Sequence, residues 1–587
     1  MIKQYFSTVA VGFLAVTCLF AQEKQLNLSD FENPSKSWEE AGDIMVNPID
    51  GSYETAKGSG VFVNLPSKKN KGEDIRTSEE FSDFDLSFEY MMFPGSNSGV
   101  YMQGRYEIQL LDSWKKQNPT SGDNGGIYER WMEDKQTGYE GYAPRQNASR
   151  APGLWQTMSI SFQAPRFNDA GEKVENARIL SIVLNGVEIQ SDVELSGPTR
   201  GAWGEESPTG PIRIQGDHGR VAFRNMKITT FNNPVPVIEG MTYEVYKGLF
   251  MDVPDFSTLT PVASGSAEII TPSVSSVKGP FLLRYTGKMI INTPGEYDFG
   301  AMFNGGAGRL MIDGNEVIAV REWGGDGKAT LAAGEHDFEL LYGKIYDWAA
   351  TGLRFATRGP GIRWVSFHDE NVNMVTATSP IFVHAPAVHR SFVDIEGGTR
   401  LIRAVSVGTE QGIHYTYDMD HGAIVQGWHG NFMNATPMWN DRGDGSARPL
   451  GAVTMLDGNN LIVGNGTWSS DTTGTSFRTR GYRLEGETTP LFIYDIFGGK
   501  VTDQIVAAAD GGGLNRTIRM EGLGSGYQIR LAHGKNISDI GKGLYRVDGD
   551  YFIKTSEGTS STVRSMPDGS MVLQVPAQSN FSYQIIF

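Results

Sequence analysis

One short stretch of the chain alternates polar and apolar residues, and its polar members could bind or transform a sugar. As a β-strand, residues 105–110 direct Arg105, Glu107 and Gln109 to one face, and Gln103 continues the row. An arginine, a carboxylate and two amides can hydrogen-bond several hydroxyl groups, so the row predicts a sugar-binding groove. The alternative is the solvent-facing side of an antiparallel sheet, the commonest fate of such a row.

A second ionisable pair, Asp217-His218, stands between two glycines after residues 211–215. This spacing predicts a strand end or bulge from which side chains can reach a cleft. A neighbouring carboxylate can tune a histidine for proton transfer near neutral pH. An isolated Asp-His pair is more often structural, which is the alternative.

A polar, glycine-rich loop, residues 114–153, lies between these two segments and carries Tyr128 and Trp131. Aromatic rings on a loop suit stacking against sugar rings. An ordinary surface loop is the alternative explanation of the same composition.

The elements that must position these residues are short strands. Residues 86–90 alternate apolar and polar side chains, as do residues 211–215, and residues 221–228 form a further strand. Asn185-Gly186 is a strong hairpin signal because both turn positions need positive φ. With 72 glycines and 11% aromatic residues among 587, the chain is expected to be all-β, built from sandwiches or barrels.

Proline-rich linkers divide the chain into three expected domains, which follow a leader segment, residues 1–21. The domains are residues 22–233, 237–370 and 380–587, a number that suits the length of the chain.

The leader has the features of a signal peptide. Lys3 supplies positive charge, and the apolar run 9–20 is too short to span a bilayer, so we expect cleavage after Ala21. The protein is then exported to the periplasm or surface of a bacterium; a lipoprotein anchored at Cys18 is the less favoured alternative. Cys18 is the only cysteine, so the mature chain has no disulfide, thiolate metal site or cysteine nucleophile.

The formal net charge of −17 argues against nucleic acid and anionic membranes as partners. No other apolar segment approaches membrane-spanning length, so the chain is expected not to be transmembrane.

Several segments of the first domain occur together in an order that resembles one family. They are Asn97-Ser-Gly-Val-Tyr101, Gly104-Arg-Tyr-Glu-Ile-Gln-Leu-Leu-Asp112, Gly126-Ile-Tyr128, Pro152-Gly-Leu-Trp-Gln156, Pro211-Ile-Arg-Ile-Gln215, Asp217-His-Gly219 and Phe223-Arg-Asn225. They resemble the 3-keto-disaccharide hydrolase family, whose fold is a concanavalin-like jelly roll. One departure is Gly216, since the family pattern often runs from Gln directly to Asp-His-Gly.

The resemblance implies cleavage of 3-keto glycosides, either by C2 proton abstraction and C1 leaving-group elimination or by hydrolysis. A C3 carbonyl acidifies the C2 proton, so one base, one acid and a positive group for the enolate oxygen suffice. Glu107 and His218 are interchangeable candidates for base and acid, and Arg105 is the candidate cation. A divalent metal ion held by Asp217, Glu107 and His218 is the alternative to Arg105. The candidate substrate-binding residues are Gln103, Gln109, Asp112, Tyr128, Trp131, Trp155 and Gln215.

The second domain resembles the protective-antigen-type β-barrel on residues 281–287, 294–299, 308–314 and 331–338. Asn304-Gly-Gly stands where lectin-like members carry paired aspartates, so a spacer or docking role is expected. The third domain is expected to be a β-sandwich-like domain without an assigned function.

Two other classes of function compete with the enzyme, because a fold does not fix a function. One is a non-catalytic glycan-binding surface protein, and the other is a cell-surface scaffold that contacts partner proteins.

Overall fold

The computed structural model describes residues 23–369, 380–395, 398–440, 445–456, 461–466, 468, 471–486 and 488–587. The expected signal peptide, residues 1–21, lies outside them. Regular structure in the described residues is almost entirely β, which confirms the all-β prediction; the exceptions are α1 (Thr436–Asn440), η1 (Leu28–Asp30), η2 (Phe256–Thr258) and η3 (Pro272–Val274). Within the same residues no helix has the length and apolarity to cross a membrane.

The chain folds into two compact units. Of the described residues, unit 1 contains residues 229–369, and unit 2 joins residues 24–228 to those from 380 to 587.

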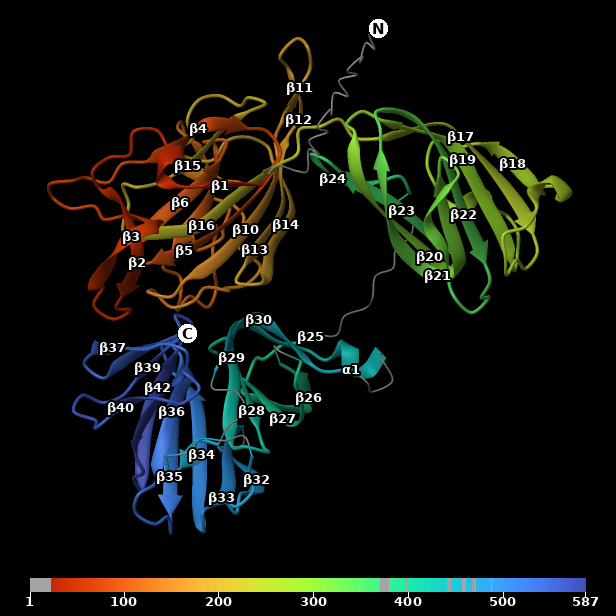
Figure 1. Ribbon diagram of the computed structural model, residues 1–587. Coiled ribbons are helices and arrows are strands. Elements are labelled where there is room, and N and C mark those ends of the chain that lie inside the picture. Colours follow the sequence, from red (N-terminus) through yellow and green to blue (C-terminus); the bar gives the residue numbers. More distant parts are fainter. Residues whose placement is uncertain are drawn as a thin grey trace, which may run out of the picture. The chain divides into compact units, whose positions relative to one another are not determined.

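The N-terminal part of unit 2 is a sandwich of two antiparallel sheets (Figure 1). The larger sheet runs in the order β14 (Val187–Leu195), β13 (Ala177–Leu184), β10 (Gln156–Gln163), β5 (Phe84–Met92), β16 (Val221–Thr230), β3 (Tyr53–Asn64) and β2 (Trp38–Val46), with β1 (Glu23–Leu26) on β16. The smaller sheet runs β4 (Ile75–Phe81), β15 (Gly210–Ile214), β6 (Asn97–Met102) and β7 (Tyr106–Leu111). Two small hairpins, β8 (Arg130–Met132) with β9 (Thr137–Tyr139) and β11 (Arg166–Phe167) with β12 (Lys173–Glu175), complete this part.

Alternation along the strands builds the core of this sandwich. Phe88 and Tyr90 of β5 meet Ile108 of β7 and Ile214 of β15 in one buried cluster. The predicted hairpin is confirmed, because Asn185 and Gly186 join β13 to β14 with φ of 49° and 80°. Since the apolar sides of β7 and β15 fill the core, their polar residues are left on the outer face of the smaller sheet.

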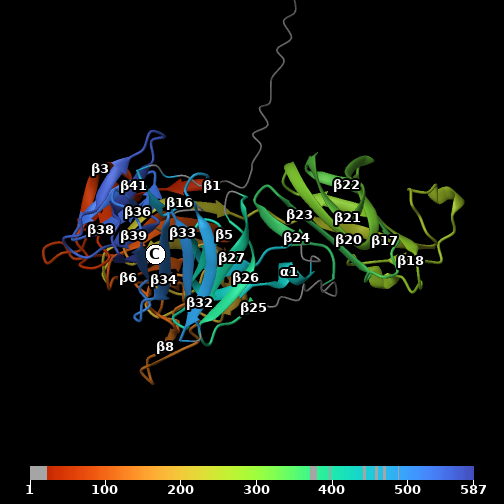
Figure 2. The same cartoon turned by 90° about the horizontal axis from the view of Figure 1, so that it is seen from below.

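Unit 1 is one antiparallel sheet with its own core of buried aromatic and aliphatic residues. Its strands run in the order β18 (Ala263–Ser266), β17 (Val237–Lys247), β19 (Phe281–Ile291), β22 (Gly334–Lys344), β20 (Gly295–Ile312), β23 (Gly352–Gly359) and β24 (Ile362–Ser366), with β21 (Asn315–Leu331) on β20. Figure 2 labels all of them except β19, seen from below. Asp313 and Gly314 form the tip of the β20–β21 hairpin.

The C-terminal part of unit 2 contains three antiparallel sheets. The first comprises β25 (Pro380–Ile381), β29 (Ala423–Asn434), β28 (Ile413–Asp418), β27 (Arg400–Gly408) and β26 (Ala387–Asp394), with β30 (Arg448–Met455) on β29. The second comprises β31 (Val463–Gly464), β36 (Gln528–Gly534), β41 (Met571–Pro576) and β40 (Thr562–Ser565). The third comprises β32 (Arg478–Glu485), β33 (Thr489–Ile496), β34 (Gly499–Ala507), β35 (Leu514–Glu521), β42 (Asn580–Ile586), β39 (Tyr551–Lys554), β38 (Leu544–Val547) and β37 (Ile537–Gly541).

The two parts of unit 2 share an apolar contact. Leu154 and Trp114 of the N-terminal part pack in one buried cluster with Phe552 and Ile586 of the C-terminal part. The Trp114 indole Nε1–H also donates to the Phe587 carbonyl oxygen at 3.0 Å. This contact joins sequence segments that all of unit 1 separates.

Candidate active site

A row of polar side chains crosses three strands on the outer face of the smaller sheet. In the strand register Glu107 of β7 lies opposite Tyr101 of β6, and Tyr101 lies opposite Arg213 of β15. Their neighbours in the strands, Ile108 and Ile214, point into the core. The row therefore places a carboxylate, a phenol and a guanidinium side by side on one face.

Glu107 is buried although it lies outside the core, with only 3% of its surface exposed. Its carboxylate lies over Gly99 of β6, because a Cβ added to Gly99 would come within 2.3 Å of Glu107 Oε1. Burial raises the pKa of Glu107 to about 7, against the opposing effects of the Tyr101 hydroxyl, Arg213 and His218. A solvent-facing sheet surface, the alternative for this row, does not describe Glu107.

Arg213 is held in place on the same face as this carboxylate, with Tyr101 between them in the strand register. Its Nε donates to the Asp74 carboxylate at 2.7 Å, and its Nη1 donates to the Gly201 carbonyl oxygen at 2.6 Å. The guanidinium also lies 4.1 Å from the ring centres of both Tyr101 and Trp203. Two contacts of the guanidinium with Asp74 Oδ2, together with the stacking, fix its plane, so the positive charge stays on the Glu107 face.

Asp217 and His218 follow the end of β15, as the glycines around them predicted. The Asp217 carboxylate contacts His218 Nδ1, and about half of each side chain is exposed. The Asp74 carboxylate also accepts from the Gly216 N–H at 2.9 Å, so one side chain fixes both Arg213 and the segment that leads to His218. His218 lies near enough to Glu107 to lower the pKa of that carboxyl.

Gly216, the departure from the family pattern, has a structural reason. An added Cβ would come within 2.1 Å of the Glu73 carbonyl oxygen. The Asn64 side chain donates to the Gly216 carbonyl oxygen at 2.6 Å. The close backbone approach therefore requires glycine and holds the Asp217-His218 segment against β3.

A second row lies beside the first and contains two of the candidate substrate-binding residues. Gln109 of β7 pairs with Gly99 of β6, and the Gln215 N–H donates to the Gly99 carbonyl oxygen at 2.9 Å. The Gln109 amide donates to the side-chain oxygen of Asn97. The buried Gln215 Oε1 has no hydrogen-bond partner among the described residues, so it can accept from a ligand hydroxyl.

Gln103 and Arg105 belong to the β6–β7 turn, so the prediction that Gln103 continues the strand row is wrong. Gln103 has a φ of 53° and its amide donates to the carbonyl oxygens of Phe81 and Pro208. Arg105 Nη1 donates to the carbonyl oxygens of Gln103 and Thr209. Both side chains therefore support the segment that precedes β15.

Asp112, Tyr128 and Trp131 occupy three different places around the sheet. The Asp112 carboxylate accepts from the Gly95 N–H at 2.8 Å and closes the β5–β6 loop. The Tyr128 N–H donates to the Glu107 carbonyl oxygen at 3.0 Å, and because its neighbour Ile127 is in the core, Tyr128 faces the Glu107 side. The Arg200 guanidinium lies 3.7 Å from the Trp131 ring centre and covers one ring face.

Trp155 does not lie with the other candidates. It belongs to a cluster on the outer side of the larger sheet, with Ile44, Val46 and Val63. The Arg224 guanidinium lies 4.1 Å from its ring centre. The core of the sandwich separates Trp155 from the outer face of the smaller sheet.

The metal alternative fails on the residues present. Among the described residues no group of three His, Cys, Asp or Glu side chains could hold a metal ion. Asp217, Glu107 and His218 therefore do not fit a divalent cation.

Three members of the site were missed from the sequence, namely Tyr101, Arg213 and Asp74. Tyr101 and Arg213 stand inside the motifs quoted above, at positions that alternate with core residues, so strand periodicity could have found them. Asp74 precedes β4 in a polar loop and carries no comparable signal.

Comparison with known proteins assigns the N-terminal part. Residues 23–229 match the family model described as a 3-keto-alpha-glucoside-1,2-lyase-like domain. This match confirms the first resemblance over those residues and marks a domain of a carbohydrate-acting family, whereas the protective-antigen-type resemblance of residues 237–370 stays a prediction.

The search of curated proteins finds no match. Among solved structures, a candidate glycosyl hydrolase from Parabacteroides distasonis is 28% identical over 35% of this chain and 83% of that chain, with a TM-score of 0.25. A second candidate glycosyl hydrolase from the same organism is 22% identical over 35% and 98%, with a TM-score of 0.24. An anti-sigma factor domain-containing protein from Clostridium clariflavum is 13% identical over 56% and 96%, with a TM-score of 0.19.

Proposed function

We propose that residues 23–229 cleave glycosides oxidised at C3 and that Glu107 is the base that removes the C2 proton. The observation that carries the proposal is a buried carboxyl with a pKa of about 7, in one row with a fixed guanidinium and near His218. A base of this pKa is half ionised at neutral pH and still accepts a proton readily.

The proposed elimination needs only groups of this chain. Glu107 takes the C2 proton, and the electron pair of the C–H bond forms an enolate with negative charge on the C3 oxygen. The enolate then collapses, the C1–O bond breaks, and His218 as imidazolium protonates the departing oxygen. The products are a 1,2-unsaturated 3-keto sugar and an alcohol, and addition of water across the double bond gives the hydrolysis product.

Arg213 takes the role that the sequence suggested for Arg105. The Arg105 guanidinium donates to two backbone carbonyls, whereas Arg213 lies in the row that contains Glu107. A fixed cation beside a developing enolate oxygen lowers the barrier because it needs no reorganisation during the reaction.

Leaving-group dependence tests the two roles separately. The full chain is assayed with 4-nitrophenyl and methyl 3-keto-glucosides, and C2 deuterium exchange is followed in D2O. Glu107→Gln is expected to lower kcat/KM about 1,000-fold on both substrates. His218→Ala is expected to cost about 100-fold on the methyl glycoside and far less on the nitrophenyl glycoside, whose anion leaves unprotonated.

Glu188→Gln, which removes an exposed carboxylate of the same domain, is the matched control and leaves turnover unchanged. Wild-type turnover by both active-site variants would refute the mechanism. Binding of unmodified glycans without any turnover would instead favour the non-catalytic glycan-binding alternative.

A further inference from the structure

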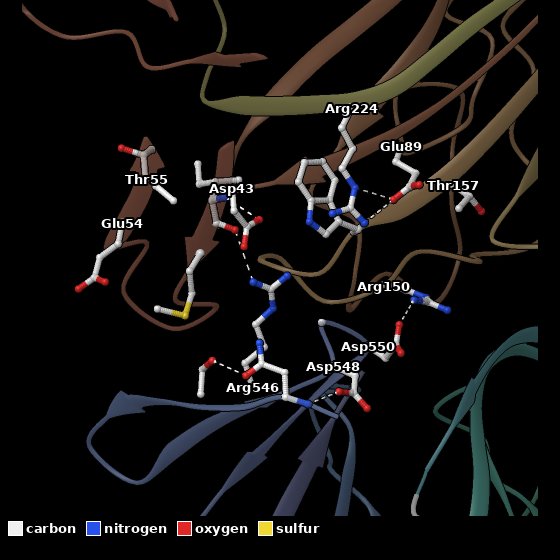
Figure 3. A pocket seen from close by; sticks show the side chains of 17 residues that line it. Asp43, Glu54, Thr55, Glu89, Arg150, Thr157, Arg224, Arg546, Asp548 and Asp550 are labelled. Carbon is white, nitrogen blue, oxygen red and sulfur yellow. Dashed lines mark hydrogen bonds and ion pairs between the residues drawn. The ribbon is translucent and has the colours of Figure 1, made fainter. Parts of the chain in front are cut away.

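A cavity of about 630 Å³ lies between the two parts of unit 2, on the outer side of the larger sheet. Figure 3 shows Asp43, Glu89 and Arg224 lining it from the N-terminal sandwich, and Arg546 and Asp550 from the C-terminal part. The core of the sandwich separates it from the outer face that carries Glu107. Its volume falls within the range of roughly 300–1,000 Å³ that small-molecule sites occupy.

Arg546 is a weakly paired charged group of this cavity. It is buried, with 9% of its surface exposed, and Figure 3 shows it reaching between Asp43 and Arg224. Its hydrogen bond to the Ile44 carbonyl oxygen is long, at 3.4 Å, and its Nε has no hydrogen-bond partner. Among the described residues no carboxylate lies within ion-pair distance of it. Burial lowers the pKa of Arg546, as expected for a guanidinium without a close counter-ion.

Arg150 and Trp155, which line the same cavity, also have buried N–H groups without an acceptor. Arg150 reaches Asp550 only at 3.4 Å and the Val453 carbonyl oxygen at 3.5 Å, and its Nε has no partner. The Trp155 indole Nε1–H is also buried without a partner. Buried donors without acceptors cost free energy, so the wall favours a ligand that supplies acceptors.

The charged residues that line the cavity restrict the charge and the hydrogen-bonding groups of such a ligand. Five carboxylates line the cavity with three guanidinium groups, so an anion meets net repulsion. Glu89 pairs with Arg224, at 2.6 and 2.8 Å, and Asp43 Oδ1 accepts from the Ile44 N–H at 2.8 Å. Asp43 Oδ2 and the Glu54 carboxylate are the acceptors that the wall offers to a ligand. A ligand must therefore both accept from arginines and donate to carboxylates, and adjacent hydroxyl groups do both.

We propose that this cavity binds a neutral oligosaccharide segment, at a site formed jointly by the two parts of unit 2 and separate from Glu107. The site does not depend on the reaction proposed above. Its role is to hold a glycan that need not be oxidised, while the Glu107 face acts elsewhere on the same domain.

Isothermal titration with the full-length Glu107→Gln chain tests the site without turnover. The probes are neutral hexaoses of glucose, mannose, galactose and xylose, with tri-galacturonate as the anionic probe. At least one neutral hexaose is expected to bind, and tri-galacturonate is expected not to. Thr157→Trp, which fills the cavity from an exposed position, is expected to weaken binding at least about tenfold.

Ser159→Trp is the matched control, since Ser159 is exposed on the same face of β10, two residues on, and does not line the cavity. Arg546→Met is a second variant and is expected to weaken binding as Thr157→Trp does. The proposal is overturned if no neutral hexaose binds, if only tri-galacturonate binds, or if Thr157→Trp behaves like Ser159→Trp. Turnover of 3-keto glucosides by Thr157→Trp on the wild-type background separates failure of this site from failure of the Glu107 mechanism.

Discussion

The surroundings of Glu107 disfavour its ionised form, and the positive charge of Arg213 weakens this effect. Burial is the largest effect on its pKa, and Arg213 and the Tyr101 hydroxyl partly offset it. The balance leaves a carboxyl that changes its ionisation near neutral pH, where proton abstraction from a 3-keto sugar would take place.

The pH dependence of turnover follows from this balance. For the wild type, kcat/KM is expected to rise between pH 5 and 8 with its midpoint near pH 7, because the base must be ionised. Arg213→Gln removes a neighbouring positive charge, so the midpoint is expected to move to higher pH as the maximum rate falls. Initial rates with 4-nitrophenyl 3-keto-glucoside measure both, and a flat profile across pH 7 would contradict the role of Glu107.

The same pKa predicts a stability effect with a definite sign. The folded pKa of about 7 exceeds the ordinary value of 4.5, so the folded state binds the proton more tightly and loses stability as pH rises through 7. Glu107→Gln cannot ionise, so it should gain stability over the wild type by about 3 kcal/mol above pH 8 and almost nothing below pH 5. Urea unfolding of unit 2 at pH 5 and 8.5 measures the difference, and an equal effect at both pH values would exclude a buried titrating carboxyl.

At the scale of the strands, the sequence predicted what depends on local periodicity. The core-facing residues of β5, β7 and β15 and the Asn185-Gly186 turn follow from alternation and from positive φ, which are properties of a few consecutive residues. Glu107 and Gln109 were placed on one face for the same reason.

Other features of the site depend on which strands pair, and periodicity carries no such information. Arg213 lies beside Tyr101 because β15 pairs with β6 in one particular register, more than a hundred residues apart in sequence. Gln103 is not part of the polar row because the β6–β7 turn begins at this residue. Trp155 lies on the outer side of the larger sheet, although its motif belongs to the same family pattern.

Substitution of Gly99 in β6 tests whether turnover depends on the position of the Glu107 carboxylate of β7. Gly99→Ala would place a methyl group 2.3 Å from the present position of Glu107 Oε1, while its backbone conformation suits alanine. We expect a folded protein whose kcat/KM falls about 100-fold because the carboxylate is displaced. Gly122→Ala is the control, since its nearest neighbour would lie 3.7 Å away. Undiminished turnover in Gly99→Ala would show that the carboxylate position is not critical; circular dichroism checks the fold.

At the scale of the whole molecule, two parts of unit 2 distant in sequence are expected to unfold together. The buried cluster of Trp114 and Leu154 with Phe552 and Ile586 joins them, and unit 1 has a separate core. Cooperative unfolding follows where apolar surface is shared.

Scanning calorimetry should therefore show two transitions, one for each unit. Trp114→Ala is expected to destabilise the unit 2 transition by about 3–5 kcal/mol and to leave the unit 1 transition unchanged. Trp348→Ala, at a site with 77% of its surface exposed in unit 1, is the control and should shift neither transition strongly. A loss confined to a third, separate transition would show that the two parts of unit 2 unfold independently.

The interrupted sequence of unit 2 has a consequence for biosynthesis. A ribosome completes residues 24–228, then makes all of unit 1, and only afterwards delivers the strands that cover Trp114 and Leu154. The nascent protein therefore exposes this apolar patch, formed by Trp114 and Leu154, throughout the translation of unit 1. Variants that slow late folding should aggregate through this patch, whereas equally destabilising changes in unit 1 should not.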